Sequence, residues 1–162
     1  MKQITTVDLN KIKESLVDKM KLNFKNSGSI LPVVFIIAPN GDLTIIATPY
    51  TSHEEKDFMM NTVRQMCKRV DAIAVCIINE AWVRIAKGSL KEAEKEMKDA
   101  GKRISDYDDK KEVALMMFET KLTGETIMFD MDRTNNELIN KTGGMTAGGS
   151  FSNILSPIIN KN

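Results

Sequence analysis

Charged side chains recur at alternate positions in two apolar segments of the second half of the chain. Asp130 and Asp132 interrupt the apolar run that begins at Ile127, and Glu119 and Lys121 have the same spacing one segment earlier. Residues two positions apart on a strand point to the same face of a sheet. Carboxylates and amines that share a face can transfer protons or hold a divalent cation. These four charged residues are therefore the candidates for catalytic chemistry.

The segment Ile127–Thr134 resembles the first motif of haloacid-dehalogenase-type phosphotransferases, in which Asp-x-Asp-x-Thr follows an apolar strand. The resemblance implies that Asp130 is the nucleophile, that Asp132 is the general acid, and that both help to hold a magnesium ion. Arg133 stands where a glycine is usual, and the 28 residues after Thr134 contain no aspartate to complete the metal site. We prefer a hairpin strand with two solvent-facing carboxylates, and keep a metal-dependent phosphoryl-transfer or hydrolytic enzyme as an alternative.

The segment Glu119-Thr-Lys121 has the Glu-x-Lys spacing of restriction-type nucleases, with Asp109 as the conceivable upstream acid. That fold places the motif on an early strand of a contiguous sheet, whereas here it follows a predicted central strand and a charged insertion. We therefore interpret Glu119 and Lys121 as an exposed charge pair near the tip of a hairpin.

The only histidine, His53, excludes catalytic triads, Cys-His pairs and multi-histidine metal sites built within this chain. The acids that follow it suit the first turn of a helix, where the helix dipole favours negative charge. The glycine-rich segment Lys141–Ser150 has its lysine at the wrong end for a phosphate loop. No cofactor or metal site is predicted, and the protein is expected not to be an enzyme.

Two β-branched runs flank Asn40-Gly41, a dipeptide typical of a two-residue type I′ turn, and predict a hairpin. That turn predicts the pairs Ala38–Leu43, Ile36–Ile45 and Val34–Ala47, which form one apolar face. The other face is apolar along the first strand and mixed along the second. A helix, a tail or another subunit is expected to cover it in part.

Apolar residues at helical spacing predict an amphipathic helix over Leu9–Phe24 and a second one that begins with a capping box at Ser52-His-Glu-Glu55. The apolar side of the second helix is predicted to carry Phe58, Met59, Val63, Met66, Cys67 and Val70. The run Ala72–Ile78 is apolar on both faces and predicts a central strand, which continues towards Ile85 if a bulge accommodates Asn79 and Glu80.

The rest of the chain divides into a charged insertion at 87–112, a second hairpin and a tail. Within the insertion, Ser89 and Gly101 predict the two ends of a short exposed helix over Leu90–Ala100. The hairpin joins Val113–Lys121 to Thr126–Asp132, with a turn at Thr123-Gly124 that pairs Leu122 with Glu125. This pairing puts on one face Met116, Phe118, Ile127, Phe129 and Met131. Residues 134–162 are rich in Gly, Ser and Asn and predict a flexible C-terminal arm.

Together these elements predict an α/β chain of the α+β type. The order is helix, strand, strand, helix, strand, charged insertion, strand, strand and tail, which gives a mainly antiparallel five-stranded sheet with two amphipathic helices in a single domain over residues 1–133. This order is similar to that of roadblock and profilin-like domains over roughly Thr5 to Asp132. The similarity is one of element order and includes no shared motif.

Net charge and hydropathy bear on which classes of partner and which compartment are expected. A formal net charge of +1 and a pI of about 7.7 give no bulk reason to expect nucleic acid or an acidic membrane. The longest apolar run is too short to cross a bilayer, and the two cysteines, Cys67 and Cys76, suit the buried thiols of a reducing, cytoplasmic compartment.

The functional hypothesis is therefore a non-catalytic module for protein interaction or self-association, with a protein partner or a second copy of the chain. A small-ligand sensor with an apolar cavity between helix and sheet is a further alternative.

Overall fold

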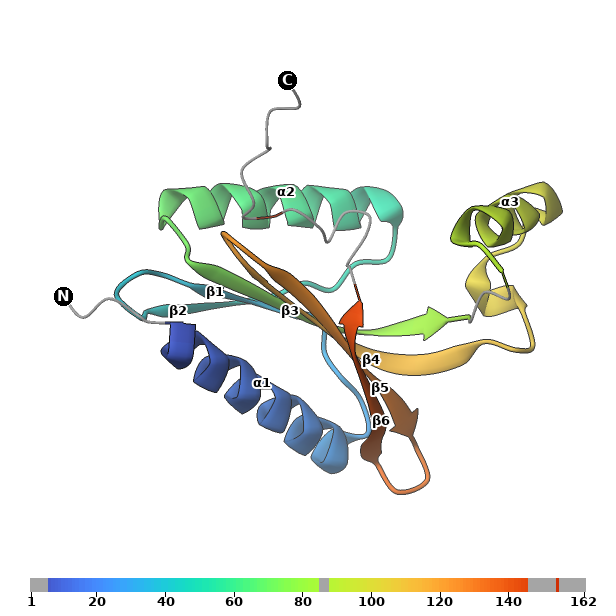
Figure 1. Ribbon diagram of the computed structural model, residues 1–162, viewed down its shortest axis with the longest axis horizontal. Coiled ribbons are helices and arrows are strands. Elements are labelled where there is room, and N and C mark those ends of the chain that lie inside the picture. The colour runs from blue at the N-terminus through green and yellow to red at the C-terminus, as the bar shows by residue number, and fades with distance from the viewer. Residues whose placement is uncertain (1–5, 85–87, 146–153, 155–162) are drawn as a thin grey trace.

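The computed structural model describes residues 6–84, 88–145 and 154. It contains one antiparallel sheet with helices on both sides (Figure 1). The helices are α1 (Thr6–Ser27), α2 (His53–Arg69), α3 (Leu90–Ala100) and a single 3-10 turn, η1 (Ile104–Asp106). The strands are β1 (Val33–Ile37), β2 (Leu43–Ala47), β3 (Ala74–Val83), β4 (Lys111–Thr120), β5 (Gly124–Asp132) and β6 (Glu137–Met145).

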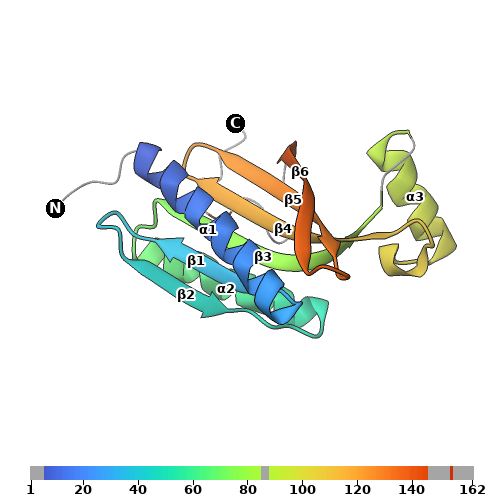
Figure 2. The same ribbon diagram turned by 90° about the horizontal axis from the view of Figure 1, so that it is seen from below.

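The sheet has the order β2-β1-β3-β4-β5-β6, so β2 and β6 are its two edges. Helix α1 lies across one face and α2 lies on the opposite face, as Figures 1 and 2 show. Helices α1 and α2 each cover a separate hydrophobic core. The α1 side buries Phe24, Ile37, Met116 and Phe129, among others. The α2 side buries Val34, Ile36, Met60, Val63 and Cys67, among others.

The predicted fold class is confirmed as a mixture of helices and antiparallel strands, but the predicted strand count was wrong. The sheet has six strands rather than five. The described residues include the two predicted amphipathic helices and α3, the short helix predicted over Leu90–Ala100 within the charged insertion. The sixth strand, β6, lies within the segment predicted as a flexible arm. This part of the segment is ordered because it pairs with β5 through main-chain hydrogen bonds. The remainder of that arm, apart from Ile154, lies outside the described residues.

The first hairpin exists, but its predicted register was wrong by one residue. Its pairs include Ile37↔Leu43, Phe35↔Ile45 and Val33↔Ala47. The Gly41 amide donates to the Ala38 carbonyl, and the Ala38 amide donates to the Asp42 carbonyl, so three residues form the loop instead of two. Gly41 has a φ of 88° and closes this wider turn in the left-handed region.

The second hairpin keeps its predicted faces but has another register. Met116 pairs with Ile127, and Glu119 pairs with Gly124. The turn lies at Thr120–Thr123, where the Thr120 hydroxyl accepts hydrogen bonds from the Leu122 and Thr123 amides. Two residues per strand separate this register from the predicted one, and because that shift is even, the side chains stay on the predicted faces.

The helix ends largely follow the predicted signals. Ser89 and Glu92 form a complete capping box on α3, and Gly101 ends that helix with a φ of 63°. On α2, Ser52 accepts from the Glu55 amide, but the Glu55 carboxylate accepts from Thr51 instead of completing the box.

The apolar side of α2 differs from its prediction at Phe58, whose side chain is 74% exposed. Met60, two residues further along α2, is buried instead. Strand β3 pairs with β4 in one uninterrupted register, so no bulge occurs at Asn79 or Glu80. The far ends of β3 and β4 extend beyond the other strands and lead to α3 and η1 (Figure 1).

Candidate interaction surface

The first of the candidate catalytic residues, Asp130, uses its carboxylate in structural contacts. It lies on β5, forms an ion pair with Lys111 and accepts a hydrogen bond from the Asn140 amide at 2.8 Å. Burial raises the pKa of Asp130, but the contacts with Lys111 and Asn140 outweigh burial and leave that pKa below its usual value. Asp130 therefore remains an anion that joins β4, β5 and β6.

The second candidate, Asp132, caps the loop between β5 and β6. Its carboxylate accepts hydrogen bonds from the side-chain amide of Asn135 at 2.9 Å, from the Thr134 backbone amide at 3.0 Å and from the Asn135 backbone amide at 3.3 Å. The contacts with Asn135, followed by the Thr134 amide, hold the pKa of Asp132 below its usual value. Asp130 thus links neighbouring strands, whereas Asp132 stabilises the loop after β5, although both lie on the same face of the strand.

Of the other two candidates, Lys121 forms an ion pair with an acid outside the second hairpin. The Lys121 ammonium lies 2.6 Å from the Asp71 carboxylate, at the turn that follows α2. Glu119 lies opposite Gly124 on the second hairpin. Asp109, the conceivable upstream acid, binds the Arg84 guanidinium at 2.7 Å, in the charged segment near α3.

Arg133, which occupies the usual glycine position of the phosphotransferase motif, organises a structural cluster. Its guanidinium contacts both carboxylate oxygens of Glu112, and it donates to the Gly28 carbonyl at 2.7 Å. Glu80 lies 3.4 Å from the same guanidinium and accepts a hydrogen bond from the Ile30 amide at 2.7 Å. A hydrogen bond from Arg133 lowers the pKa of Glu112, as expected for a bidentate ion pair. These charges join the end of α1 to the sheet.

No group of three or more candidate metal ligands occurs within residues 6–84, 88–145 and 154. His53 is exposed at the start of α2. Within the same residues, no helix combines the length and apolar character needed to span a bilayer.

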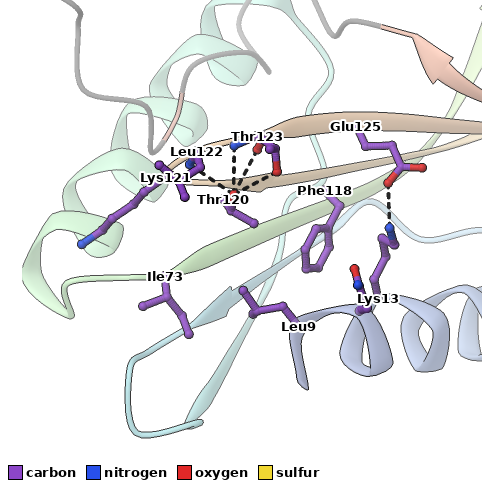
Figure 3. Close-up of a pocket in the computed structure, with 10 residues that line it drawn as sticks. Leu9, Lys13, Ile73, Phe118, Thr120, Lys121, Leu122, Thr123 and Glu125 are labelled. Carbon is purple, nitrogen blue, oxygen red and sulfur yellow. Dashed lines mark hydrogen bonds and ion pairs between the residues drawn. The ribbon is translucent and has the colours of Figure 1, made fainter. Parts of the chain in front are cut away.

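A hollow of about 300 Å³ lies between the start of α1 and the β4–β5 turn (Figure 3). Leu9, Ile73 and Phe118 give it an apolar lining. Most of its polar side chains already have partners: Lys13 binds Glu125 at 2.7 Å, Lys121 binds Asp71 at 2.6 Å, and the Thr120 hydroxyl is bonded within its own turn.

A surface of another kind lies at β2, one of the two edges of the sheet. Paired residues of an antiparallel ladder alternate between those that exchange hydrogen bonds and those that do not. The Thr48 amide donates to the Pro32 carbonyl, and Ala38 pairs with Asp42 by a hydrogen bond, so the even-numbered residues of β2 bond inward to β1. The amides and carbonyls of Leu43, Ile45 and Ala47 consequently point away from the sheet.

Those same three residues also expose their side chains, since β2 alternates between exposed and half-buried positions. Leu43 is 41% exposed and Ile45 is 60% exposed. Between β1, β2 and α1 lies a groove of about 440 Å³, lined mainly by apolar side chains. They include Met20, Ile30, Leu31, Val33, Phe35 and Ile45.

Further exposed apolar side chains lie on α1 and on the segment before β1, both of which contribute to the same groove as Ile45. Leu22 on α1 is 56% exposed and Leu31, before β1, is 78% exposed. On the opposite side of the sheet, exposed Phe58 lies beside Pro49, which follows β2. We name the outward backbone groups of β2, together with Leu22, Leu31, Leu43, Ile45 and Phe58, the β2 edge surface.

The sequence predicted a partly covered apolar face, but it did not identify this surface. The signal was present as the absence of any acidic or basic residue between Leu43 and Ser52. A neutral apolar strand reads equally well as a buried strand, and only the position of β3 beside β1 leaves β2 outermost.

Comparisons of the chain with models of known protein families, with curated proteins and with solved structures find no match.

Proposed function

We propose that this protein is a non-catalytic interaction module that binds an extended polypeptide strand at the β2 edge surface. The observation that carries the proposal is the coincidence of unpaired backbone groups and exposed apolar side chains at Leu43, Ile45 and Ala47. An added strand gains affinity from main-chain hydrogen bonds and specificity from alternate side chains. The neighbouring groove offers an apolar seat for those side chains.

The arrangement of the charged residues also supports a binding role. Asp130, Asp132 and Lys121 each contact a different part of the fold, and each contact stabilises a strand pair or a turn. A catalytic carboxylate must instead be free to exchange protons or reach a reacting atom. This distribution favours binding over the alternative of phosphoryl transfer at Asp130 and Asp132.

A labelled strand peptide tests the proposal. The probe is a fluorescent peptide with the sequence of residues 42–50, flanked by lysines for solubility and titrated with the full chain while its anisotropy is measured. We expect saturable binding to the wild-type chain and to Leu122→Lys, whose site is 94% exposed on a distant turn, and at least tenfold weaker binding to Ile45→Lys.

The matched control is the same peptide N-methylated at every backbone amide, which cannot donate to an edge. Equal binding of the methylated peptide, or equal binding to Ile45→Lys, would contradict the proposal.

A further inference from the structure

We propose that the strand bound at the β2 edge surface belongs to a second copy of this chain. Two β2 strands would pair antiparallel about a two-fold axis that passes through Ile45, joining two sheets into one. This inference rests on the proposed function and names the partner for it.

The backbone of β2 is self-complementary in this register. Hydrogen bonding across the new pair requires outward residues to face outward residues. Pairing Ile45 with Ile45 of the other copy satisfies this, and it also places Leu43 opposite Ala47 in both directions. Each outward residue thus meets an outward residue. Pro49 and the loop at Gly41 limit the pairing to this short strand.

The charges are equally compatible with a second copy. Isologous contacts place identical surfaces together, so any charge near the axis would meet its own kind. The β2 strand has no acidic or basic residue, and Lys19 is the one charged residue lining the adjacent groove. The nearest acid in the sequence, Asp42, would lie opposite Thr48 and about 20 Å from its own copy across the axis, given a rise of about 3.4 Å per residue. A neutral strand of this kind offers no charge that would select a foreign partner.

The available apolar area suits a dimer. Fully burying one large apolar side chain removes roughly 60–120 Å² from water. The five partly exposed side chains of the β2 edge surface therefore offer on the order of 400 Å² per copy, before the backbone edge and polar rim are counted. A standard interface buries about 800 Å² per partner. In a symmetric dimer, this apolar surface would be removed from water on both copies.

The described C-terminal residue lies elsewhere. Ile154 is buried in the core on the α2 side of the sheet, together with Val34 and Met60. The groove beside Ile45 lies on the α1 side, against Met20 and Ile30. The one C-terminal residue that the structure places beyond β6 is therefore on the opposite face from the groove.

Site-directed thiols test both the partner and the register. Directly opposed, hydrogen-bonded residues have Cα atoms about 5.5 Å apart, which lies within the range of a disulfide. We expect Ile45→Cys to form a covalent dimer upon mild oxidation. Ala47→Cys would lie about 14 Å from its own copy, so it should cross-link poorly alone but efficiently when mixed with Leu43→Cys. The native thiols, Cys67 and Cys76, are buried and do not compete.

The chain Leu122→Cys measures cross-linking by random collision, because its site is 94% exposed and far from β2. Cross-linking of Ile45→Cys at the same rate as Leu122→Cys would overturn the inference. So would efficient self-cross-linking of Ala47→Cys.

Light scattering of the unmodified chain between 1 and 100 μM, a range chosen to span typical weak dimers, gives the second measurement. We expect a concentration-dependent dimer that Ile45→Lys weakens at least tenfold and Leu122→Lys preserves. A strict monomer that still binds the strand peptide would overturn the second copy and leave the proposed function standing. A monomer that does not bind the peptide would overturn both. A dimer unaffected by Ile45→Lys would place the interface elsewhere and overturn the inference.

Discussion

The two edges of the sheet, β2 and β6, differ in how far they are protected against pairing with another strand. An exposed edge presents unpaired amides and carbonyls, and proteins commonly protect it with charges, bulges or irregular backbone. Strand β6 has these devices: it carries Glu137 and Lys141, its register with β5 shifts twice, and Asn140 has a φ of 52°. Strand β2 has a continuous register and no charge. The contrast indicates that β6 is built to end the sheet and that β2 is left able to extend it.

The largest expected effect is a loss of stability that differs between residues of β2 whose amides point to β1 and residues whose amides point away from the sheet. Proline lacks an amide hydrogen, so Ile46→Pro removes an inward hydrogen bond to β1, whereas Ile45→Pro removes only an outward donor. We expect Ile46→Pro to lower the free energy of unfolding by roughly 3 kcal/mol. Ile45→Pro should cost about 1 kcal/mol while abolishing strand-peptide binding. Urea denaturation and peptide anisotropy measure the two effects; equal losses of stability would show that the alternation is misassigned.

The next effect concerns Asp130, which secures the protected edge. Replacing it by Asn removes charge-assisted hydrogen bonds to Lys111 and Asn140, and we expect a loss of about 2 kcal/mol at pH 7. The folded-state pKa of Asp130 is depressed, so its contribution is present above the unfolded-state pKa and disappears as pH falls through the folded-state pKa.

The unfolding free energy of the wild-type chain should therefore fall as pH is lowered from about 5 to about 2, and Asp130→Asn should show a shallower fall. Parallel pH profiles for the two chains would argue against an ionised Asp130 in the folded state.

An effect of similar size is expected at the irregular backbone of β6. Asn140→Ala loses the hydrogen bond to Asp130 and places a Cβ-bearing residue without a polar side chain at positive φ, at a cost of about 2 kcal/mol. Asn140→Gly loses the hydrogen bond but tolerates the backbone conformation, so it should recover about half of that cost. Thermal unfolding of both variants checks this order, and a glycine variant less stable than the alanine variant would contradict it.

The smallest effect tests whether one charge alone protects β6. We expect Lys141→Val to change stability by less than about 0.5 kcal/mol and to leave the oligomeric state unchanged, because the register shifts and Asn140 still disrupt the edge. Light scattering measures this directly. If Lys141→Val alone produced larger assemblies, charge rather than backbone irregularity would be the main protection.

The contrast between the edges also explains what the sequence could predict. Alternating apolar residues gave the correct faces for β4 and β5, because side-chain direction depends only on parity. It could not give the register of the first hairpin, since Asn40-Gly41 fits a two-residue turn, whereas the chain forms a three-residue loop in which Gly41 alone takes the left-handed conformation. Strand β6 was missed because its asparagines and glycines are typical of a linker, and its pairing with β5 is what orders it.

The sequence could predict an apolar interaction surface in general, but not which residues form it. Every residue of the β2 edge surface is an ordinary apolar residue, and its exposure follows from strand order, which depends on contacts between distant segments. The contacts of the charged candidates could not be predicted for a related reason: spacing places Asp130 and Asp132 on one face, but their partners Lys111, Asn140 and Asn135 lie on neighbouring strands and loops.

The contact between Arg133 and the Gly28 carbonyl joins residues 105 positions apart. Its closure is costly in chain entropy and must await the second hairpin, because Arg133 follows directly after β5. During synthesis, helix α1 is made before every strand of the sheet, yet this contact at its C-terminal end can form only after Arg133 has left the exit tunnel. The apolar stripe of α1 is thus available to chaperones while the strands are being synthesised.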